Sequence, residues 1–163
     1  MVYASFIPHQ CMPIEIKVLS ASDAAALGRV APDVFDYAVD GGAARAFLTD
    51  PRCHLVVALD DGLVVGMVSS LRYVHPDKPI PELWIDEVAV ASSHHRRGIG
   101  KALMLATLDL GRTLGCSQAW VLTDRANHAA LALYTSAGGT EPSDELVMFE
   151  FDLGNSASSD RAP

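Results

Sequence analysis

The sequence has few basic residues and few cysteines. Lys and Arg number 12 against 20 Asp and Glu, which gives the 163-residue chain a formal net charge of −8. This charge repels phosphodiester backbones, so no nucleic-acid partner is expected, whereas a cationic partner is favoured where the acids gather. The three cysteines, Cys11, Cys53 and Cys116, form no CxxC pair, so neither a disulfide framework nor a zinc ribbon is indicated. A reducing cytoplasm fits them best.

Long hydrophobic runs are also missing. No apolar run approaches the roughly 20 residues that a membrane-spanning helix needs. Met1 to Pro13 has no basic start, and Pro8 and His9 interrupt its short apolar stretch, so no signal peptide is expected there. The sequence therefore predicts a cytoplasmic protein with no membrane partner.

Several catalytic motifs are absent as well. The chain has no GxSxG elbow and no GxxxxGK[ST] phosphate loop, which excludes the common serine-hydrolase and P-loop patterns. Its histidines lack the i, i+4 spacing of helical zinc ligands, and they have no neighbouring cysteines of the kind that zinc sites usually contain, so no metal is expected. Cys53 and Cys116 lie in apolar segments typical of small core residues.

What is present indicates one α/β domain. Half of the residues are hydrophobic and 20% are charged, an ordinary globular balance. We expect an N-terminal extension over 1–13, one domain over 14–153 and a disordered polar tail over 154–163. Apolar alternation predicts strands, and 3.6-residue periodicity predicts helices. The expected order is a strand from Ile14, an Ala-rich helix capped by Ser20 or Ser22 and ended by Pro32, a short helix over 43–48, a hairpin of 54–59 and 63–71, a proline-punctuated loop over 76–81, a strand over 83–90, a helix over 98–114, a strand over 119–122, a helix over 128–137 and a last strand over 146–153.

The most informative segment is the turn that follows the strand Val88-Ala89-Val90. It reads Ser92-Ser93-His94-His95-Arg96-Arg97-Gly98-Ile99-Gly100-Lys101 and opens a helix. Backbone N–H groups at the positive end of a helix dipole bind anions, and glycines let a ligand approach closely. The turn therefore predicts a pyrophosphate cradle, with a solvated basic turn whose glycines serve packing as the alternative.

These residues resemble the acetyl-CoA signature of the GCN5-related N-acetyltransferase (GNAT) superfamily, Gln/Arg-x-x-Gly-x-Gly/Ala after a strand ending in Glu-Val-Ala-Val. Glu87-Val88-Ala89-Val90 and the glycine turn match it, with His95 at the position of the Gln/Arg. A second block, from Asn127 through Leu133-Tyr134 to Gly138, resembles the superfamily's Asn-x-x-Ala-x-x-Leu-Tyr-x-x-x-Gly helix. The resemblance covers roughly Ile14 to Leu153.

This resemblance implies a mixed, splayed central sheet flanked by helices, and acetyl-CoA as the cofactor. It implies direct transfer of acetyl to a primary amine in a ternary complex. The cofactor-binding residues that it implies are Val88, Ala89, Val90, His95, Arg96, Arg97, Gly98, Ile99, Gly100, Lys101, Asn127 and Tyr134. Within the superfamily, shorter matches such as Leu131-Ala132-Leu133-Tyr134-Thr135 look most like the aminoglycoside 3-N-acetyltransferases.

Two residues are candidate catalysts under this resemblance. Glu87, in the strand expected beside the pantetheine arm, could take a proton from the amine directly or through water. Asp86 is expected on the opposite face by strand alternation. Tyr134 could protonate the departing thiolate, and the N–H groups of Val88 and Val90 could pair with the pantetheine. The alternatives are that Glu87 only anchors the substrate, that Tyr134 is a core residue and that Asn127 only bonds its loop.

The acceptor is expected to be a small amine, most simply an aminoglycoside acetylated at the 3-amino group. Carboxylates that could bind a polycation are Asp33, Asp36, Glu87, Asp124, Asp144 and Glu145. Other acceptors remain open, namely a peptide N-terminus, a lysine or a polyamine. A non-enzymatic acyl-CoA sensor is the alternative of another class, and a homodimer is left open.

Overall fold

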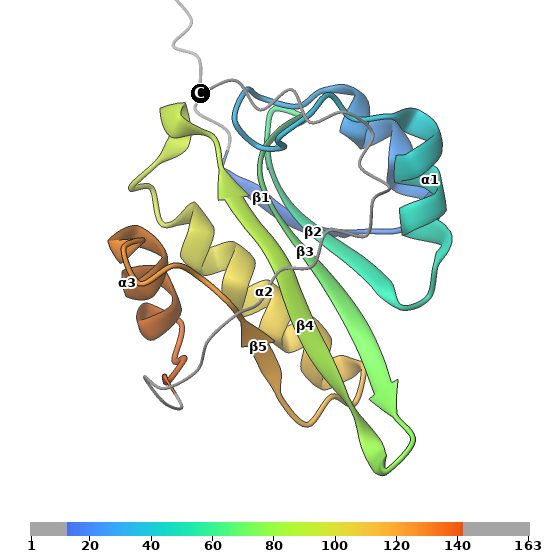
Figure 1. Cartoon of the computed structure of the whole chain (residues 1–163). Coiled ribbons are helices and arrows are strands. Elements are labelled where there is room, and N and C mark those ends of the chain that lie inside the picture. The colour runs from blue at the N-terminus through green and yellow to red at the C-terminus, as the bar shows by residue number, and fades with distance from the viewer. Residues whose placement is uncertain (1–12, 142–163) are drawn as a thin grey trace, which may run out of the picture.

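Five strands form one mixed sheet in a computed structural model that describes residues 13–141 (Figure 1). They follow the chain in the order β1 to β5, antiparallel except for the parallel pair of β4 and β5. The strands are β1 (Glu15–Leu19), β2 (Cys53–Asp60), β3 (Leu63–His75), β4 (Lys78–Val90) and β5 (Ala119–Val121). The helices are the 3-10 helix η1 (Ala21–Gly28), α1 (Gly41–Thr49), the 3-10 turn η2 (Ser92–His94), α2 (Ile99–Thr113) and α3 (His128–Ser136). The expected mixed α/β fold is confirmed.

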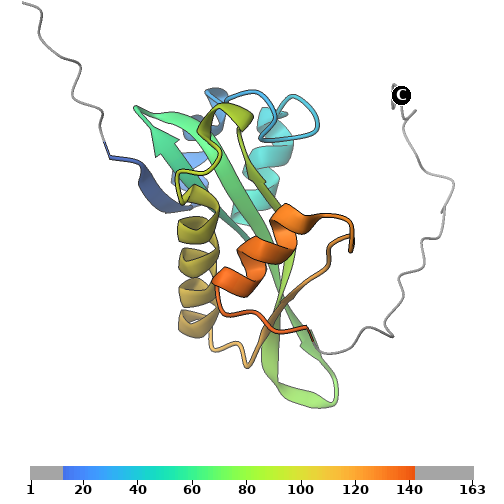
Figure 2. The same ribbon diagram turned by 90° about the vertical axis from the view of Figure 1, so that its left-hand side faces the viewer.

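Helices cover both faces of the sheet. Helix α2 contacts β1, β2, β3 and β4, whereas η1 and α1 lie on the opposite face (Figure 2). The central strands β2 and β3 are therefore buried on both sides, which explains why they read as nearly continuous apolar runs. Val56, Val57, Val65, Met67 and Val68 are among the residues with no exposed surface.

The expected hairpin between β2 and β3 is confirmed. Asp61 and Gly62 form its turn with φ of 49° and 72°, the left-handed values that a tight hairpin needs. The same turn is tied to the preceding segment, because Val30 bridges Val64 in parallel. Residues 29–31 therefore lie beside the start of β3, next to the hairpin turn.

The proline-punctuated loop expected over 76–81 is wrong. Strand β4 starts at Lys78, opposite His75, and includes Pro79 and Pro81. Proline lacks the N–H that a central strand must donate, so it is confined to free edges. Strand β4 pairs with β5 only over Leu83–Ile85, so both prolines lie where β4 has no ladder partner on that side within the described residues.

Smaller departures lie at the N-terminal end. The Ala-rich helix is a 3-10 helix that ends at Gly28, ahead of Pro32, and Ser20 caps it reciprocally with Asp23. In the edge strand β1, Ile16 packs against the core together with the preceding Ile14, as expected, but Val18 is 44% exposed and Leu19 is buried. The expected last strand, the N-terminal extension and the tail lie outside the described residues.

Close packing of α2 on the sheet depends on Gly66 in β3. A Cβ on Gly66 would lie 3.0 Å from the Ala89 carbonyl oxygen and 3.1 Å from Leu103 Cδ1. Because a backbone atom is one of the two neighbours, the crowding cannot be relieved by a rotamer change alone.

Replacing Gly66 with alanine should therefore lower the free energy of unfolding by about 1–3 kcal/mol. Gly28→Ala is the matched control, since its Cβ would meet nothing within 4 Å, and it should change stability by less than about 0.5 kcal/mol. Urea unfolding followed by circular dichroism measures both. Equal midpoints for the two variants would contradict the packing argument.

Candidate active site

The site begins where β4 and β5 separate. Their ladder has only three residue pairs, the last being Ile85 with Val121, and β4 then continues to Val90 paired with β3 alone (Figure 1). Within the described residues, Asp86 to Val90 have no ladder partner on the β5 side. Unpaired backbone N–H and C=O groups of a strand edge are available to an extended ligand. The splay expected from the sequence is confirmed.

A bulge in β4 sets the side chains at this point. Glu87 pairs with Ser69 and Ile85 pairs with Ser70, so Asp86 is an extra residue opposite the same stretch of β3. A bulge interrupts strict alternation and re-aims side chains. The expectation that alternation alone places Asp86 and Glu87 on opposite faces is therefore wrong. Asp86 is exposed, and its carboxylate accepts a hydrogen bond from Trp84 Nε1 at 3.1 Å.

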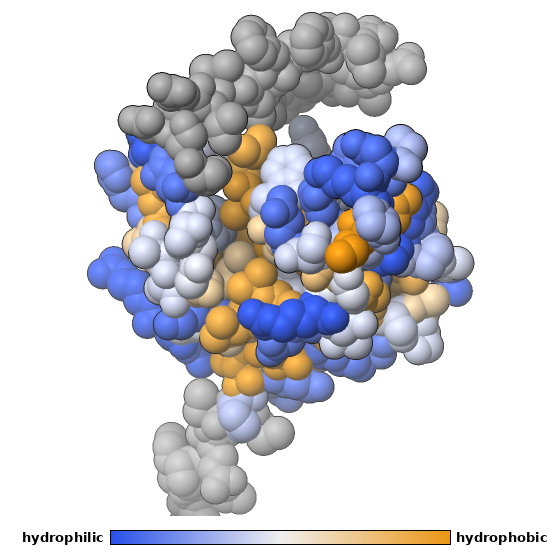
Figure 3. Space-filling view, turned by 90° about the horizontal axis from the view of Figure 1, so that it is seen from below, coloured by the Kyte–Doolittle hydropathy of each residue, from blue (hydrophilic) through white to orange (hydrophobic). Residues whose placement is uncertain are grey.

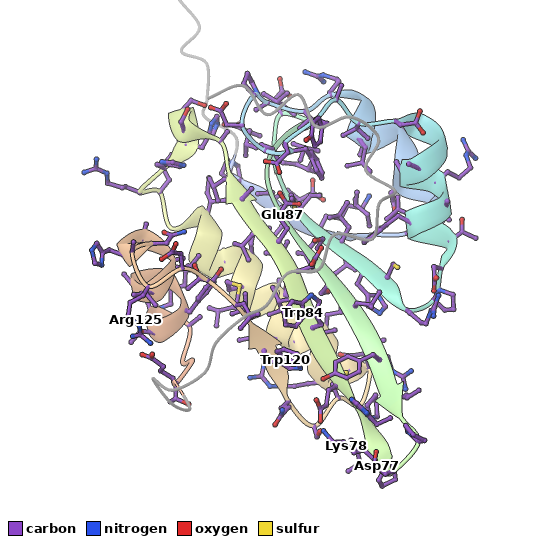
Figure 4. All side chains as sticks on the ribbon, in the orientation of Figure 1. Asp77, Lys78, Trp84, Glu87, Trp120 and Arg125 are labelled. Carbon is purple, nitrogen blue, oxygen red and sulfur yellow. The ribbon has the colours of Figure 1, made fainter. Side chains whose placement is uncertain are left out.

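Three of the predicted acceptor carboxylates meet in one hollow beside the bulge. It has a volume of about 480 Å³. Its lining residues are Asp33, Val34, Phe35, Asp36, Glu87, Val88 and Ala89, from the segment before α1 and from β4. Figure 4 shows Glu87 on β4, close to that segment. We call this feature the acidic hollow. Its carboxylates come from two segments more than fifty residues apart in the sequence, which only the fold brings together.

Among the described residues, the remaining predicted acid, Asp124, is not part of the acidic hollow. Asp124 lies in the β5–α3 segment, where its Oδ1 accepts a hydrogen bond from the Ala126 N–H at 2.8 Å. Asp144 and Glu145 lie outside the described residues. Of the predicted acids within residues 13–141, Asp33, Asp36 and Glu87 line the hollow.

Glu87 has the electrostatic environment of a stronger base than an ordinary carboxylate. Its burial raises the pKa above the usual value, and the negative charges of Asp36 and Asp86 raise it further. Burial disfavours the ionised form, and so do like charges nearby. A carboxylate with a raised pKa in a concave site is a candidate for proton transfer.

The turn before α2 combines two left-handed residues. Arg96 and Gly98 have φ of 58° and 78°, and α2 begins at Ile99. The first N–H groups of an α-helix have no partner inside the helix and are free for a ligand. A Cβ on Gly98 would meet nothing within 4 Å, so this position opens to solvent in front of those groups. Arg96, Arg97 and Lys101 are exposed around it. These features fit the pyrophosphate of coenzyme A.

The second glycine of the turn serves a different purpose. A Cβ on Gly100 would lie 3.3 Å from Leu133 Cδ2, so this glycine lets α2 and α3 pack closely. The expectation that both glycines clear space for a ligand is wrong for Gly100. The packing alternative holds at Gly100, and the open approach holds at Gly98.

Distant side chains hold the turn in place. The Nε2–H of His95 donates to the Val90 carbonyl at 2.8 Å, since a carbonyl can only accept, and this bond folds the turn back on β4. His94 Nε2 lies 3.0 Å from Asp60 Oδ2, and Arg97 Nη1 lies 3.6 Å from the same oxygen. Ser92 Oγ donates to Asp33 Oδ2 at 3.0 Å. The sequence alone did not identify Asp60 or Ser92 as site residues. Asp60 is recognisable there only as part of a turn, and the residues that it contacts, His94 and Arg97, lie far from it in the sequence.

Helix α3 lies against the start of α2 through Leu133, and it carries Tyr134 and is capped by Asn127. Tyr134 is half-buried against the core, and its burial raises the pKa of the phenol. Asn127 caps α3, with its Oδ1 accepting the Ala130 N–H at 3.0 Å. That bond is the local role expected as the alternative for Asn127, and it leaves the side-chain amide nitrogen free to donate.

Competing chemistries find little support in the described part of the chain. Burial raises the pKa of Cys53 and of Cys116, which opposes formation of a reactive thiolate. Among residues 13–141, no three His, Cys, Asp or Glu side chains gather closely enough to hold a metal ion. None of the helices described there combines the length and hydrophobicity that a bilayer crossing requires.

Comparison with known proteins agrees with this geometry. The sequence profile of the Acetyltransferase (GNAT) family matches residues 25–138. Rat N-acetyltransferase family 8 member 3 is 30% identical over 112 residues, which are 69% of this chain and 49% of the relative. The chain thus spans about half the length of that relative.

Two solved structures share the fold. One is an aminoglycoside acetyltransferase from an uncultured soil metagenomic sample in complex with sisomicin, at a TM-score of 0.74 and 24% identity over 86% of this chain and 96% of that one. The other is the aminoglycoside N-acetyltransferase AAC(6′)-Iy in complex with CoA, at 0.66 and 20% identity over 90% and 99%. With the profile match over most of its length, this chain belongs to the acetyltransferase (GNAT) family.

Proposed function

We propose that this protein is an acetyl-CoA-dependent N-acetyltransferase whose acceptor is a polycationic amine of the aminoglycoside class. One observation carries the proposal. The acidic hollow, with the raised pKa of Glu87 at its edge, adjoins the stretch of β4 whose backbone is unpaired on the β5 side. An amine in the hollow and a thioester along β4 would therefore be neighbours.

Two parts of the chain would bind two different parts of the cofactor. The N–H groups at the start of α2, with Arg96, Arg97 and Lys101, suit the negative charge of a pyrophosphate. The edge of β4 at Val88 to Val90, which has no ladder partner on the β5 side in the described residues, suits the amides of a pantetheine arm. When bound, acetyl-CoA supplies the acetyl group as a thioester, and family membership supports this cofactor.

Glu87 is the group that would accept the proton of the acceptor ammonium. Only a neutral amine has the lone pair that forms the new C–N bond, and a nearby carboxylate of raised pKa holds the released proton best. Asp33 and Asp36 keep a cation in the hollow while Glu87 carries out this transfer. The expulsion of thiolate then needs a proton donor, a role that fits the half-buried phenol of Tyr134.

The substrate class rests on charge complementarity. The chain carries a net charge of −8, and three carboxylates converge where the amine would bind. A polycation gains more from such a site than a monoamine does. The aminoglycoside acetyltransferases that share the fold support the same class. The finer proposal, acetylation at the 3-amino group, rests on the sequence resemblance, and a neighbour of the 6′ type makes the 6′-amino group the competing position.

A panel of acceptors tests the function. Release of free CoA thiol should be much faster with sisomicin than with a monoamine, a free lysine or an alanine-ended peptide, and raised salt should increase the KM for sisomicin most. Mass spectrometry and NMR of the product then locate the acetyl group. Faster turnover of the peptide would show that the acceptor is a protein or peptide and not an aminoglycoside. If none of these acceptors releases CoA thiol, the proposed enzymatic function is wrong.

Cofactor binding is tested at Gly98. Gly98→Asp places a side chain and a negative charge in the open space before α2, and should weaken CoA binding at least about tenfold by calorimetry. Gly115→Asp is the control, because it has the same charge change and a similar φ of 73° but follows the far end of α2. Equal CoA affinity in the two variants would remove the turn from the cofactor site.

The pH dependence of kcat tests Glu87. Since the base must be ionised, activity should rise with pH through a pKa above the usual glutamate value, and Glu87→Gln should lower kcat by about 10²-fold or more and remove that limb. Asp36→Asn removes one negative neighbour, which lowers the pKa of Glu87 and moves the limb to lower pH. A limb that stays in place in both variants would belong to another group.

Tyr134 is tested by removal of its hydroxyl. Tyr134→Phe should lower kcat by roughly 10²-fold or more while CoA affinity and the thermal midpoint stay near those of the parent. The measurement uses a slow acceptor for which chemistry limits the rate. If kcat does not change, Tyr134 serves only the packing of α3.

A further inference from the structure

The chain's two tryptophans lie together on β4 and β5, next to the acidic hollow. Trp84 and Trp120 are register partners, and their rings meet edge to face with centroids 4.2 Å apart (Figure 4). Trp120 is 40% exposed although large aromatic side chains are usually well covered. Viewed from below, the molecule exposes other hydrophobic side chains among hydrophilic ones (Figure 3).

Hydrogen bonds fix both indoles. Trp84 Nε1 donates to Asp86 Oδ1 at 3.1 Å, and Trp120 Nε1 donates to the Tyr73 hydroxyl oxygen at 2.7 Å. The Tyr73 hydroxyl donates in turn to Glu82, which also accepts from Lys78 Nζ at 2.8 Å. The indole N–H groups are thus occupied within the protein. What Trp120 still offers to solvent is ring surface.

A carboxylate connects this pair to the acidic hollow. Asp86 is exposed, accepts from Trp84 on one side and precedes Glu87 in the bulge on the other. Its charge is close enough to contribute to the raised pKa of Glu87. Along β4, the residues of the hollow, Ala89 and Glu87, are thus followed by Asp86 and by Trp84 with its partner Trp120. We call Trp84, Asp86 and Trp120 the tryptophan ledge.

The ledge has the chemistry that recognises an organic cation with an apolar face. An aromatic ring attracts a cation through its quadrupole, and a neighbouring carboxylate adds charge attraction. An aminated sugar ring presents C–H groups and ammonium groups together and so satisfies both. A small monoamine bound in the hollow does not extend along β4 to the ledge. A molecule of two or three rings is long enough to contact both.

We propose that the tryptophan ledge is a second acceptor subsite, which binds a cationic ring distal to the amine that is acetylated. The inference rests on the proposed function and makes it more specific, because it selects acceptors of more than one ring. The alternative role of the two tryptophans is purely structural, as an aromatic cluster that only stabilises the β3–β4 hairpin.

Kinetics with a matched pair of acceptors test the subsite. Sisomicin is a multi-ring polycation, and 2-deoxystreptamine is a single aminated ring. Asp86→Asn keeps an acceptor for the Trp84 N–H and removes the charge, so it should raise the KM for sisomicin about threefold to tenfold and much more than the KM for 2-deoxystreptamine. Trp120→Ala should do the same, and Trp120→Phe should restore part of the loss. Ile80→Ala, an exposed apolar residue elsewhere on β4, is the control. Equal effects on both acceptors would overturn the subsite.

Intrinsic fluorescence gives a readout that does not depend on turnover. Trp84 and Trp120 are the only tryptophans in the chain, so tryptophan emission reports on the ledge alone. Sisomicin added without acetyl-CoA should change the emission saturably, and Asp86→Asn should shift the titration to higher sisomicin concentration by the same threefold to tenfold factor. An emission that stays constant through saturation of the site by sisomicin, as judged by calorimetry, overturns the ledge. If sisomicin binds and alters the emission but is not acetylated, the proposed function fails and the ledge stands.

Discussion

The short parallel contact between β4 and β5 is the constraint on which the site depends. Three residue pairs join the strands, and the next five residues of β4 extend past the end of β5. A longer ladder would consume the backbone groups of Val88 to Val90 and close the space beside them. Because the strands separate after Ile85, one strand can offer backbone groups on its free edge and side chains on its surface.

The bulge at Asp86 adds a second consequence at the same point. It breaks alternation where β4 leaves its partner, so that two consecutive acids serve neighbouring regions. Glu87 lines the hollow with Asp33 and Asp36, while Asp86 is held by Trp84. Burial raises the pKa of Glu87, and the negative charges of Asp36 and Asp86 raise it further. The bulge thus lies at the same place on β4 where the strand leaves β5 and where Glu87 enters the hollow.

Charge is divided between two neighbouring surfaces in an otherwise acidic molecule. Bases gather at the start of α2, and acids gather in the hollow, so an anionic cofactor and a cationic acceptor are drawn to adjacent places. Acids also hold the basic turn itself. Asp60 lies near both His94 and Arg97, and Asp33, which lines the hollow, accepts from Ser92. The turn is therefore anchored to the β2–β3 hairpin and to the segment before α1.

Local pattern predicted most of the described elements, the glycine turn and the family, because turn chemistry, periodicity and the Glu87 to Leu103 motif act over short stretches of sequence. It also singled out Asp33, Asp36 and Glu87 as acids, but only tertiary structure brought them into one hollow, since their separation along the chain contains no distance information. The bulge depends on the register of β3 against β4, which a one-strand alternation rule does not contain. The role of Gly100 depends on the approach of Leu133 from α3, and the pairing of Trp84 with Trp120 depends on the β4–β5 register. Sequence supplied the chemical groups, and long-range packing decided which of them face one another.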